Sequence, residues 1–281
     1  MLPSEAVLFS DLDGTLFHDD GYVSKENIEA IERFIAAGGK FAISTGRIPS
    51  NAMPMLKGVP INAPSVVING AAAYDSETGI YSECCYLDRT ICDPLFRWTI
   101  ENIPNVDIQI YTEDGINYVT PREHAQPDLL ALHLPCNFVK LDDLNGKSIF
   151  KALVLALEPY KEKAEAKWLN NAEGHYSCVP GISTIGNPTH FLEILPLGIN
   201  KGITLNKLRE HPKLKGRTFI AIGDYWNDYE LLKEADIAVC PENAIPEVKE
   251  ICDYITVSCN DHAIRATLED LLPSMKKSGH C

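Results

Sequence analysis

The sequence predicts an α/β protein in which a parallel-sheet domain is interrupted by a second, α+β module. Short apolar runs alternate with amphipathic helical segments over the first 70 residues and again after Lys201. Such alternation is typical of parallel strands joined by right-handed crossovers. Between about residues 84 and 187 the pattern changes to helices and strands with a sheet of their own, which indicates an insertion.

The N-terminal part of the chain begins with an uncharged apolar run, Val7 to Ser10, which predicts a buried strand. Ser24 is a good N-cap for the helix that follows, and Gly38-Gly39 ends this helix. The next expected elements are strands at residues 40–44 and 65–69 and a small hairpin whose turn is flanked by Tyr74 and Tyr81.

The middle third of the chain has its own pattern of elements. A helix is expected to begin near Asp93-Pro94, and Asp114-Gly115 predicts a turn between two paired strands. An almost purely apolar run from Ile149 to Leu157 predicts a further strand. The other expected elements are strands at 106–111, 118–120, 176–179 and 191–195 and a helix at 159–171.

The alternating pattern resumes at Lys201 with a helix, and strands are expected at 218–222 and 236–239. No internal repeat or low-complexity linker interrupts it. The predicted division is therefore a parallel-sheet domain of residues 1–83 and 188–281 and an inserted module of residues 84–187.

The composition narrows the class of function. The chain has 281 residues, 45% of them hydrophobic, and a formal net charge of −14. This charge argues against a nucleic-acid partner, which requires clustered Lys and Arg. No signal peptide is recognisable, and no apolar stretch approaches the ~20 residues of a membrane-spanning helix. The lack of such a stretch argues against a membrane partner. Nine cysteines without zinc-like spacing favour a reduced cytoplasmic protein.

Two aspartates follow the first predicted strand, one residue apart. Asp11 and Asp13 lie in the run Asp-Leu-Asp-Gly-Thr, at the carboxyl end of a strand, where open α/β sheets bind ligands. Carboxylates this close repel each other unless a cation such as Mg²⁺ lies between them. The alternative interpretation is an Asp-Gly turn with an acidic neighbour.

Two further segments offer groups that could bind phosphate. Thr45, Gly46 and Arg47 follow the second strand and provide a hydroxyl, a flexible backbone and a guanidinium. The alternative is an ordinary turn with Arg47 on the surface. Lys201 begins a helix, where the macrodipole disfavours a cation. It fits there if it neutralises a bound phosphate and Asp11, and the alternative is a solvated surface lysine.

A cluster of polar residues, Gly223-Asp224-Tyr225-Trp226-Asn227-Asp228, follows the strand at 218–222. Asp224 is expected to be a direct metal ligand. Asn227 and Asp228 could hold phosphate, the waters of the metal or Lys201. The alternative is an N-cap cluster for a helix that starts near Asp228.

Together these four segments resemble the haloacid dehalogenase superfamily of phosphatases, and within it the Cof-type branch, in which an α/β cap is inserted after the third core strand. The family signature is Asp-x-Asp-Gly-Thr, Thr-Gly-Arg, Asn-x-Lys-Gly or a close variant, and Gly-Asp-x-x-Asn-Asp. The four motifs occur in this order at residues 11–15, 45–47, 200–202 and 223–228. Each motif alone is weak, but a chance match of all four is improbable. The resemblance implies a Rossmann-like parallel-sheet core and a cap that selects the substrate.

The resemblance also implies Mg²⁺-dependent hydrolysis of a phosphomonoester through an aspartyl-phosphate. Asp11 is the implied nucleophile and Asp13 the implied general acid and base. The remaining implied roles are Mg²⁺ binding by Asp11, the backbone carbonyl of Asp13 and Asp224; phosphate binding by Thr45, Gly46, Lys201 and Asn227; and orientation of Lys201 or metal-bound water by Asp228. The role of Arg47 stays open.

Three functions are compatible with these residues. The first is hydrolysis of a small soluble phosphometabolite, for which sugar phosphates are the class that the family resemblance supports best. The second is a phosphotransferase or phosphomutase of the same superfamily, which would pass the phosphoryl group to another hydroxyl. The third is a non-catalytic protein that senses a phosphometabolite, although such a protein has no need for Asp13. The sequence does not indicate an oligomeric state.

Overall fold

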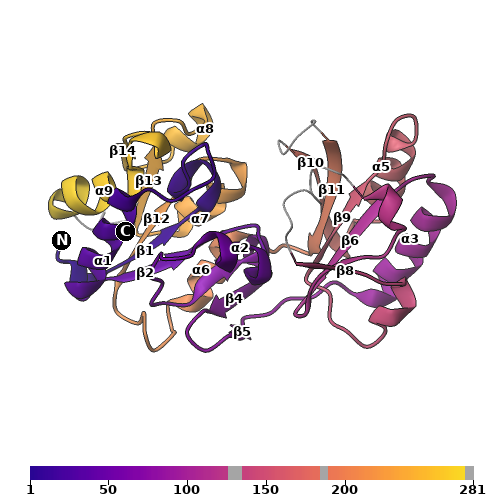
Figure 1. Ribbon diagram of the computed structural model, residues 1–281, viewed down its shortest axis with the longest axis horizontal. Coiled ribbons are helices and arrows are strands. Elements are labelled where there is room, and N and C mark those ends of the chain that lie inside the picture. The colour runs from indigo at the N-terminus through magenta and orange to yellow at the C-terminus, as the bar shows by residue number, and fades with distance from the viewer. Residues whose placement is uncertain (126–134, 184–188, 276–281) are drawn as a thin grey trace. The chain divides into compact units, whose positions relative to one another are not determined.

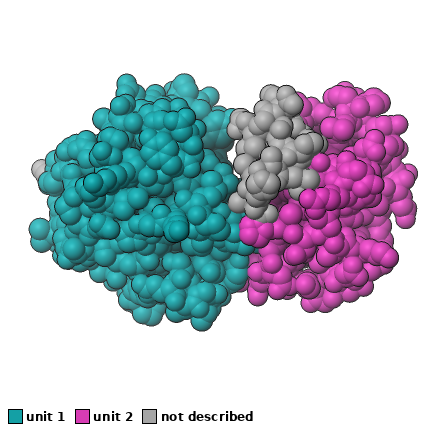
Figure 2. Space-filling model, viewed as in Figure 1, with its two compact units in different colours: residues 1–83, 200–281 teal, residues 84–199 magenta. Residues whose placement is uncertain are grey.

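The computed structural model describes residues 1–125, 135–183 and 189–275 and divides the chain into two compact units (Figures 1 and 2). Unit 1 comprises residues 1–83 and 200–281, and unit 2 comprises residues 84–199. The second boundary therefore follows residue 199, whereas the sequence analysis places it after residue 187. The cause is β11 (Thr189–Pro196), which pairs with strands of unit 2 on both of its edges.

Unit 1 is built on a five-stranded, fully parallel sheet in the order β14-β13-β12-β1-β2 (Figure 1). β1 and β12 are neighbours, and Ser10 at the end of β1 lies opposite Ile222 at the end of β12. The carboxyl ends of these two strands therefore meet. The five strands are β1 (Ala6–Ser10), β2 (Lys40–Ile43), β12 (Thr218–Ile222), β13 (Ile237–Pro241) and β14 (Tyr254–Thr256).

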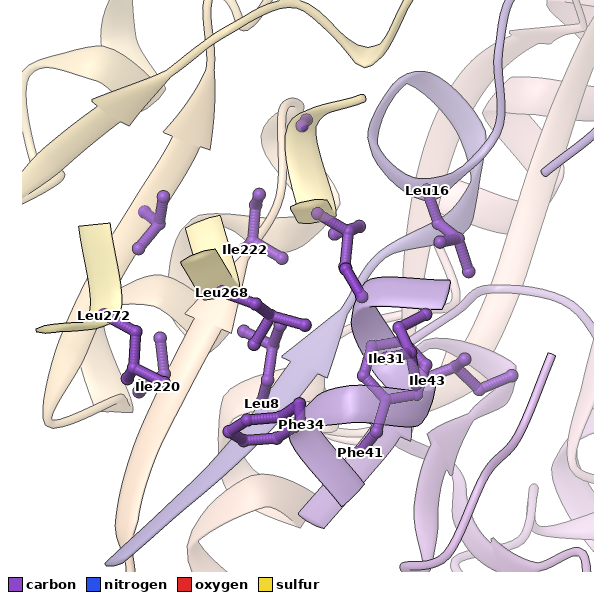
Figure 3. Packing of buried hydrophobic residues seen from close by; sticks show 14 of the residues in the cluster. Leu8, Leu16, Ile31, Phe34, Phe41, Ile43, Ile220, Ile222, Leu268 and Leu272 are labelled. Carbon is purple, nitrogen blue, oxygen red and sulfur yellow. The ribbon is translucent and has the colours of Figure 1, made fainter. Parts of the chain in front are cut away.

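Helices cover both faces of this sheet, because its central strands are apolar on both sides. Leu8, Ile220 and Phe34 pack on one face (Figure 3). Phe9 and Phe219 stack on the other, with ring centroids 5.5 Å apart. The first face is covered by α1 (Lys25–Ala36), α2 (Pro49–Met55) and α9 (Ala263–Arg265), and the second by α6 (Lys201–Leu208), α7 (Tyr229–Glu234) and α8 (Pro246–Lys249).

The third predicted strand departs from the expected parallel arrangement. β3 (Ser65–Val67) meets the main sheet through a single parallel bridge, Ser44 opposite Val66. It ends at Val67 because the next three residues, 68–70, have φ values of 55°, 52° and 92°, which no extended strand adopts.

A small antiparallel sheet follows. β3 pairs with β4 (Ala72–Asp75), and β4 pairs with β5 (Ile80–Ser82). Tyr74 lies opposite Tyr81, with ring centroids 5.0 Å apart. The predicted hairpin is therefore confirmed.

Unit 2 contains a six-stranded sheet in the order β10-β11-β9-β6-β7-β8, with α3 and α5 packed on one face. α3 begins at Arg89, one turn earlier than predicted, because Asp88 caps it by accepting a hydrogen bond from the Thr90 N–H. Pro94 consequently lies inside the helix. The elements are α3 (Arg89–Asn102), β6 (Asp107–Thr112), β7 (Gly115–Tyr118), β8 (Cys136–Phe138), β9 (Lys151–Leu155), α5 (Lys161–Leu169), β10 (Tyr176–Ser183) and β11.

Two observations concern the pairing of the cysteines and the presence of membrane-spanning helices. Every cysteine that the structure describes, eight of the nine in the sequence, is a free thiol. Within the described ranges, no helix is long and apolar enough to cross a membrane.

The two units have separate hydrophobic cores. The two apolar clusters of unit 1 contain no residue from 84–199, and the cluster of unit 2, centred on Phe96 and Trp168, contains none from outside that range. Because each core is complete within its unit, we expect unit 1 to fold when residues 84–199 are replaced by a short linker.

Circular dichroism and a cooperative thermal transition of this shortened protein test that expectation. The full-length chain is the reference. A shortened protein that stays unfolded would show that unit 1 depends on the inserted residues for its stability.

Candidate active site

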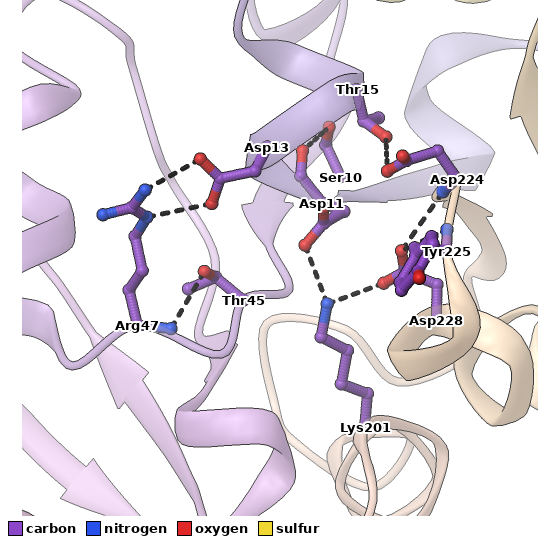
Figure 4. Close-up of polar contacts among 10 residues, drawn as sticks. All are labelled: Ser10, Asp11, Asp13, Thr15, Thr45, Arg47, Lys201, Asp224, Tyr225 and Asp228. Carbon is purple, nitrogen blue, oxygen red and sulfur yellow. Dashed lines mark hydrogen bonds and ion pairs between the residues drawn. The ribbon is translucent and has the colours of Figure 1, made fainter. Parts of the chain in front are cut away.

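A group of polar side chains in unit 1 lies where β1 and β12 end (Figure 4). Asp11 directly follows β1, and its N–H donates to the Ile222 carbonyl at 2.9 Å, which ties the two strand ends together. The Ser10 hydroxyl donates to the Asp11 carbonyl at 2.7 Å. The Asp11 side chain is only 8% exposed, so its carboxylate lies in a largely desolvated position.

Lys201 is the first residue of α6, and its side chain is fully buried. Its Nζ donates to Oδ1 of Asp11 at 2.7 Å and to Oδ1 of Asp228 at 2.6 Å. A buried ammonium group without partners would be strongly destabilising, so the two carboxylates account for its position. The interpretation of Lys201 as a solvated surface lysine is therefore wrong.

The turn after β12 places the other two carboxylates. Oδ2 of Asp228 accepts hydrogen bonds from the N–H groups of Asp224 and Tyr225 at 3.1 and 3.4 Å. This side chain thus fixes the turn with one oxygen and holds Lys201 with the other. Oδ1 of Asp224 accepts a hydrogen bond from the Thr15 hydroxyl at 3.0 Å.

Gly14 lets the loop after β1 approach Asp224 closely. Its φ is +76°, and a Cβ atom at this position would lie 2.5 Å from Oδ2 of Asp224. The Gly14 carbonyl accepts a hydrogen bond from Nδ2 of Asn243 at 2.8 Å, which fixes the loop. A larger residue here would both strain the backbone and displace the carboxylate.

The site carries more negative than positive charge. Burial, together with repulsion from Asp228 and Asp224, raises the pKa of Asp11 well above its ordinary value, although Lys201 opposes the shift. Burial and Asp228 raise the pKa of Asp224 to about 7. Burial disfavours the charged form of Lys201, but Asp11 and Asp228 outweigh this effect and raise its pKa, so the ammonium group stays protonated.

A hard divalent cation fits this arrangement. One carboxylate oxygen from each of Asp11, Asp224 and Asp228 lies within 4.8 Å of the others. Lys201 supplies one positive charge against three carboxylates, and oxygen is the ligand atom that Mg²⁺ prefers. Because both oxygens of Asp228 are already engaged by Lys201 and the backbone, Asp11 and Asp224 offer the more accessible ligands.

The Thr45-Gly46-Arg47 loop follows β2. Thr45 is buried, and its hydroxyl accepts a hydrogen bond from the Arg47 N–H at 3.1 Å. The backbone of Gly46 is packed so tightly that a Cβ atom would lie 2.7 Å from Oδ1 of Asn69. These contacts give the loop a fixed conformation after β2.

Arg47 points toward Asp13 (Figure 4). Its Nε donates to Oδ2 of Asp13 at 2.9 Å, and its Nη2 donates to Oδ1 at 2.8 Å. Arg47 is therefore not a free surface side chain. Its partner, which the sequence does not indicate, is Asp13.

The structure brings four of the eight predicted site residues into one cluster. Asp11, Lys201, Asp224 and Asp228 form one connected cluster, whereas the side chain of Asn227 is exposed and lies outside it. Sequence reasoning missed Thr15 as a partner of Asp224, although it belongs to the first motif. It also missed Asn243, which no motif signals and which links Gly14 to the Cys259 N–H.

Comparisons with known proteins give relatives over most of the chain. The 5-amino-6-(5-phospho-D-ribitylamino)uracil phosphatase of Bacillus subtilis is 27% identical, with 93% of this chain and 96% of the relative aligned. An HMP-PP phosphatase of Yersinia pseudotuberculosis is 28% identical over 85% of each chain.

The fold also matches solved structures. A haloacid dehalogenase-like hydrolase from Bacteroides thetaiotaomicron superposes with a TM-score of 0.81 and 22% identity, covering 95% of this chain and 99% of the other. At this identity the match shows the fold, and it agrees with the predicted parallel-sheet domain carrying an insertion.

A family model also matches most of the chain. The model described as haloacid dehalogenase-like hydrolase covers residues 8–268, a span that includes all four motifs. It confirms the resemblance carried by those motifs. The chain therefore belongs to the haloacid dehalogenase-like hydrolase family.

Proposed function

We propose that this chain is a Mg²⁺-dependent phosphomonoester hydrolase that acts through an aspartyl-phosphate. The observation that carries the proposal is the position of Asp11, whose carboxylate lies at the end of β1, held by Lys201 and close to Asp224. A buried carboxylate with a fixed orientation and an adjacent cation is suited to nucleophilic attack. The two curated relatives, both named as phosphatases, support the same reaction class.

Asp11 and Asp13 have different roles in the proposed reaction: Asp11 is the nucleophile, and Asp13 is the general acid and base. An Asp11 oxygen attacks phosphorus as the bond to the leaving oxygen breaks, and the Asp13 carboxyl gives its proton to that oxygen. The Asp13 carboxylate then takes a proton from the water that attacks the aspartyl-phosphate, which releases inorganic phosphate and restores both side chains.

The other site residues would bind the metal ion and the oxygens of the phosphate group. Asp11, Asp224 and the backbone carbonyl of Asp13 would hold Mg²⁺, which when bound neutralises part of the charge of the phosphate. We assign Thr45, Gly46, Lys201 and Asn227 to the phosphate oxygens. Asp228 orients Lys201 through the 2.6 Å contact.

We propose a small soluble phosphorylated metabolite as substrate, with sugar phosphates as the first class to test. The Bacillus subtilis relative is named for a phosphate carried on a D-ribityl chain, which is chemically a sugar-alcohol phosphate. Unit 2, residues 84–199, is assigned as the module that selects the leaving group.

A panel of phosphorylated metabolites tests this proposal, with release of inorganic phosphate as the readout. Adding a sugar alcohol as acceptor separates hydrolysis from phosphoryl transfer, because a transferase would give a new phosphate ester instead of inorganic phosphate. Absence of turnover on the panel and on a generic aryl phosphate would favour a binding protein.

Asp224 and Asp13 should respond differently to replacement by alanine. Asp224→Ala removes a side-chain ligand, so Mg²⁺ affinity should fall on the order of 10-fold or more, and excess Mg²⁺ should restore part of the activity. Asp13→Ala keeps the backbone carbonyl, so Mg²⁺ affinity should change little. It should instead slow hydrolysis of alkyl phosphates by on the order of 10²–10⁴-fold, and that of aryl phosphates less.

Calorimetric titration with Mg²⁺ and assays on both ester types measure this contrast. The assignment of Asp13 as the acid is wrong if Asp13→Ala loses Mg²⁺ affinity as severely as Asp224→Ala does. It is equally wrong if Asp13→Ala slows alkyl and aryl esters by the same factor.

A further inference from the structure

The pair formed by Arg47 and Asp13 has a geometry that fixes the direction of a carboxylate. Nε and Nη2 of one planar guanidinium donate to the two oxygens of Asp13, at 2.9 and 2.8 Å. The Asp13 side chain is 60% exposed, so core packing does not fix it. Two parallel hydrogen bonds to a planar group restrain both the position and the rotation of the carboxylate.

Stability does not account for this pair, because ion pairs with an exposed partner contribute little to it. The other carboxylates of the site have different partners: Lys201 holds Asp11 and Asp228, and Thr15 holds Asp224. Lys201 therefore contacts two of the four carboxylates, and Arg47 contacts a third. Arg47 holds the carboxylate that faces solvent.

The backbone around Arg47 is itself restrained. The Arg47 N–H donates to Oγ1 of Thr45 at 3.1 Å, and the Arg47 carbonyl accepts from the Ile68 N–H at 3.2 Å. Ile68 and Asn69 have φ values of 55° and 52°, and a β-branched residue rarely adopts such a conformation. The guanidinium therefore extends from a backbone segment whose conformation is held on both sides.

We infer that Arg47 is a positioning residue, which holds the Asp13 carboxylate where it exchanges a proton with the leaving oxygen and then with water. This inference rests on the proposed function. The fork of hydrogen bonds fits the ionised carboxylate, so it holds Asp13 while the aspartyl-phosphate awaits water. Once Asp13 has taken a proton from that water, one of the two hydrogen bonds opens, and the free O–H can donate to the ester oxygen of the next substrate.

The test compares an alkyl with an aryl phosphate, because an aryl leaving group needs less help from an acid. Arg47→Ala should lower kcat on the alkyl ester by on the order of 10-fold or more, which is part of the acceleration that a positioned acid supplies. On the aryl ester it should lower kcat by about 3-fold at most. Arg47→Lys keeps the charge but not the fork, so it should recover only part of the loss. In the Asp13→Ala background, Arg47→Ala should change kcat by no more than about 2-fold, because the two residues act as one unit.

Arg33→Ala is the matched control. Nε and Nη2 of Arg33 also contact a carboxylate, at 2.8 and 2.6 Å from Oε1 of Glu269, but Arg33 lies on the surface of α1. Its removal should leave the ratio of alkyl to aryl turnover unchanged.

The outcomes separate the inference from the function on which it rests. If wild-type protein hydrolyses both esters and Arg47→Ala slows them by the same factor, with or without Asp13, Arg47 does not position the acid. A parallel rise in both KM values and in the inhibition constant of inorganic phosphate would assign it to phosphate binding instead. If wild-type protein hydrolyses neither ester, the proposed function itself fails.

Discussion

Asp11→Asn is expected to abolish turnover while leaving the fold intact. Asparagine has the shape of aspartate and can still accept a hydrogen bond from Lys201, which lies 2.7 Å from Oδ1. It has no anionic oxygen to attack phosphorus, so the loss should be on the order of 10⁴- to 10⁶-fold, as for other enzymes that lose a nucleophile. Because Asp11 is one of three mutually repelling carboxylates, removing its charge should not lower thermal stability.

Hydrolysis of an aryl phosphate and the thermal midpoint measure the two halves of this prediction. Asp75→Asn is the control, since Asp75 also pairs with a lysine, Lys213 at 2.8 Å, but lies away from the site. Borohydride trapping of the wild-type acyl phosphate, followed by peptide mass spectrometry, locates the modified residue. Substantial activity in Asp11→Asn, or trapping at another residue, would rule out Asp11 as the nucleophile.

The elements of unit 1 are predicted well where local chemistry determines them. β12 occupies residues 218–222, as expected from one uninterrupted apolar run. Ser24 caps α1 by accepting from the Asn27 N–H, and α1 ends before Gly38. Apolar runs, caps and glycines are local signals, so they can be read without knowledge of the tertiary structure.

The second domain boundary depends on long-range strand pairing, and in the structure it lies after residue 199. The run at 191–195 is predicted as a strand, and it lies within β11, but nothing local shows that its partners are β9 and β10 in unit 2. The same limit applies to β3, whose antiparallel partner β4 comes after three residues with positive φ. Strand patterns predict where a strand lies, but not which sheet it joins.

The candidate site likewise combines features that the sequence indicates with contacts that only the folded chain shows. The motifs at 11–15 and 223–228 are expected to share one Mg²⁺ site because of the family resemblance, and each follows a predicted strand, where open α/β sheets bind ligands. The Thr15–Asp224 hydrogen bond joins residues 209 apart in sequence, and only the folded chain reveals it. The Arg47–Asp13 pair likewise depends on the direction that the loop after β2 takes.

Lys201→Met is expected to lower both stability and activity. Methionine keeps much of the apolar stem but removes the ammonium group that contacts Asp11 and Asp228. Breaking a buried ion pair by removing one partner costs about 3–5 kcal/mol. For a protein unit of this size the loss corresponds to a thermal midpoint roughly 6–20 °C lower.

Lys213→Met shows how much of the stability lost in Lys201→Met is due to the burial of the ion pair. Lys213 also contacts two carboxylates, those of Asp75 and Glu77 at 2.8 and 2.7 Å, but its side chain is 32% exposed. Water can solvate the carboxylates that this substitution leaves behind, so its effect should stay below about 1 kcal/mol. Differential scanning calorimetry of both variants, with aryl phosphate turnover measured in parallel, gives the comparison.

The carboxylates left by Lys201→Met also make stability depend on cations. With the ammonium group gone, Asp11, Asp224 and Asp228 face one another with oxygens within 4.8 Å, so added Mg²⁺ should raise the thermal midpoint of Lys201→Met more than that of wild type. Turnover should stay low even then, because Mg²⁺ does not restore the contact that orients Asp11. Equal destabilisation in Lys201→Met and Lys213→Met, or full activity of Lys201→Met, would show that the buried ammonium group neither balances this charge nor holds the nucleophile.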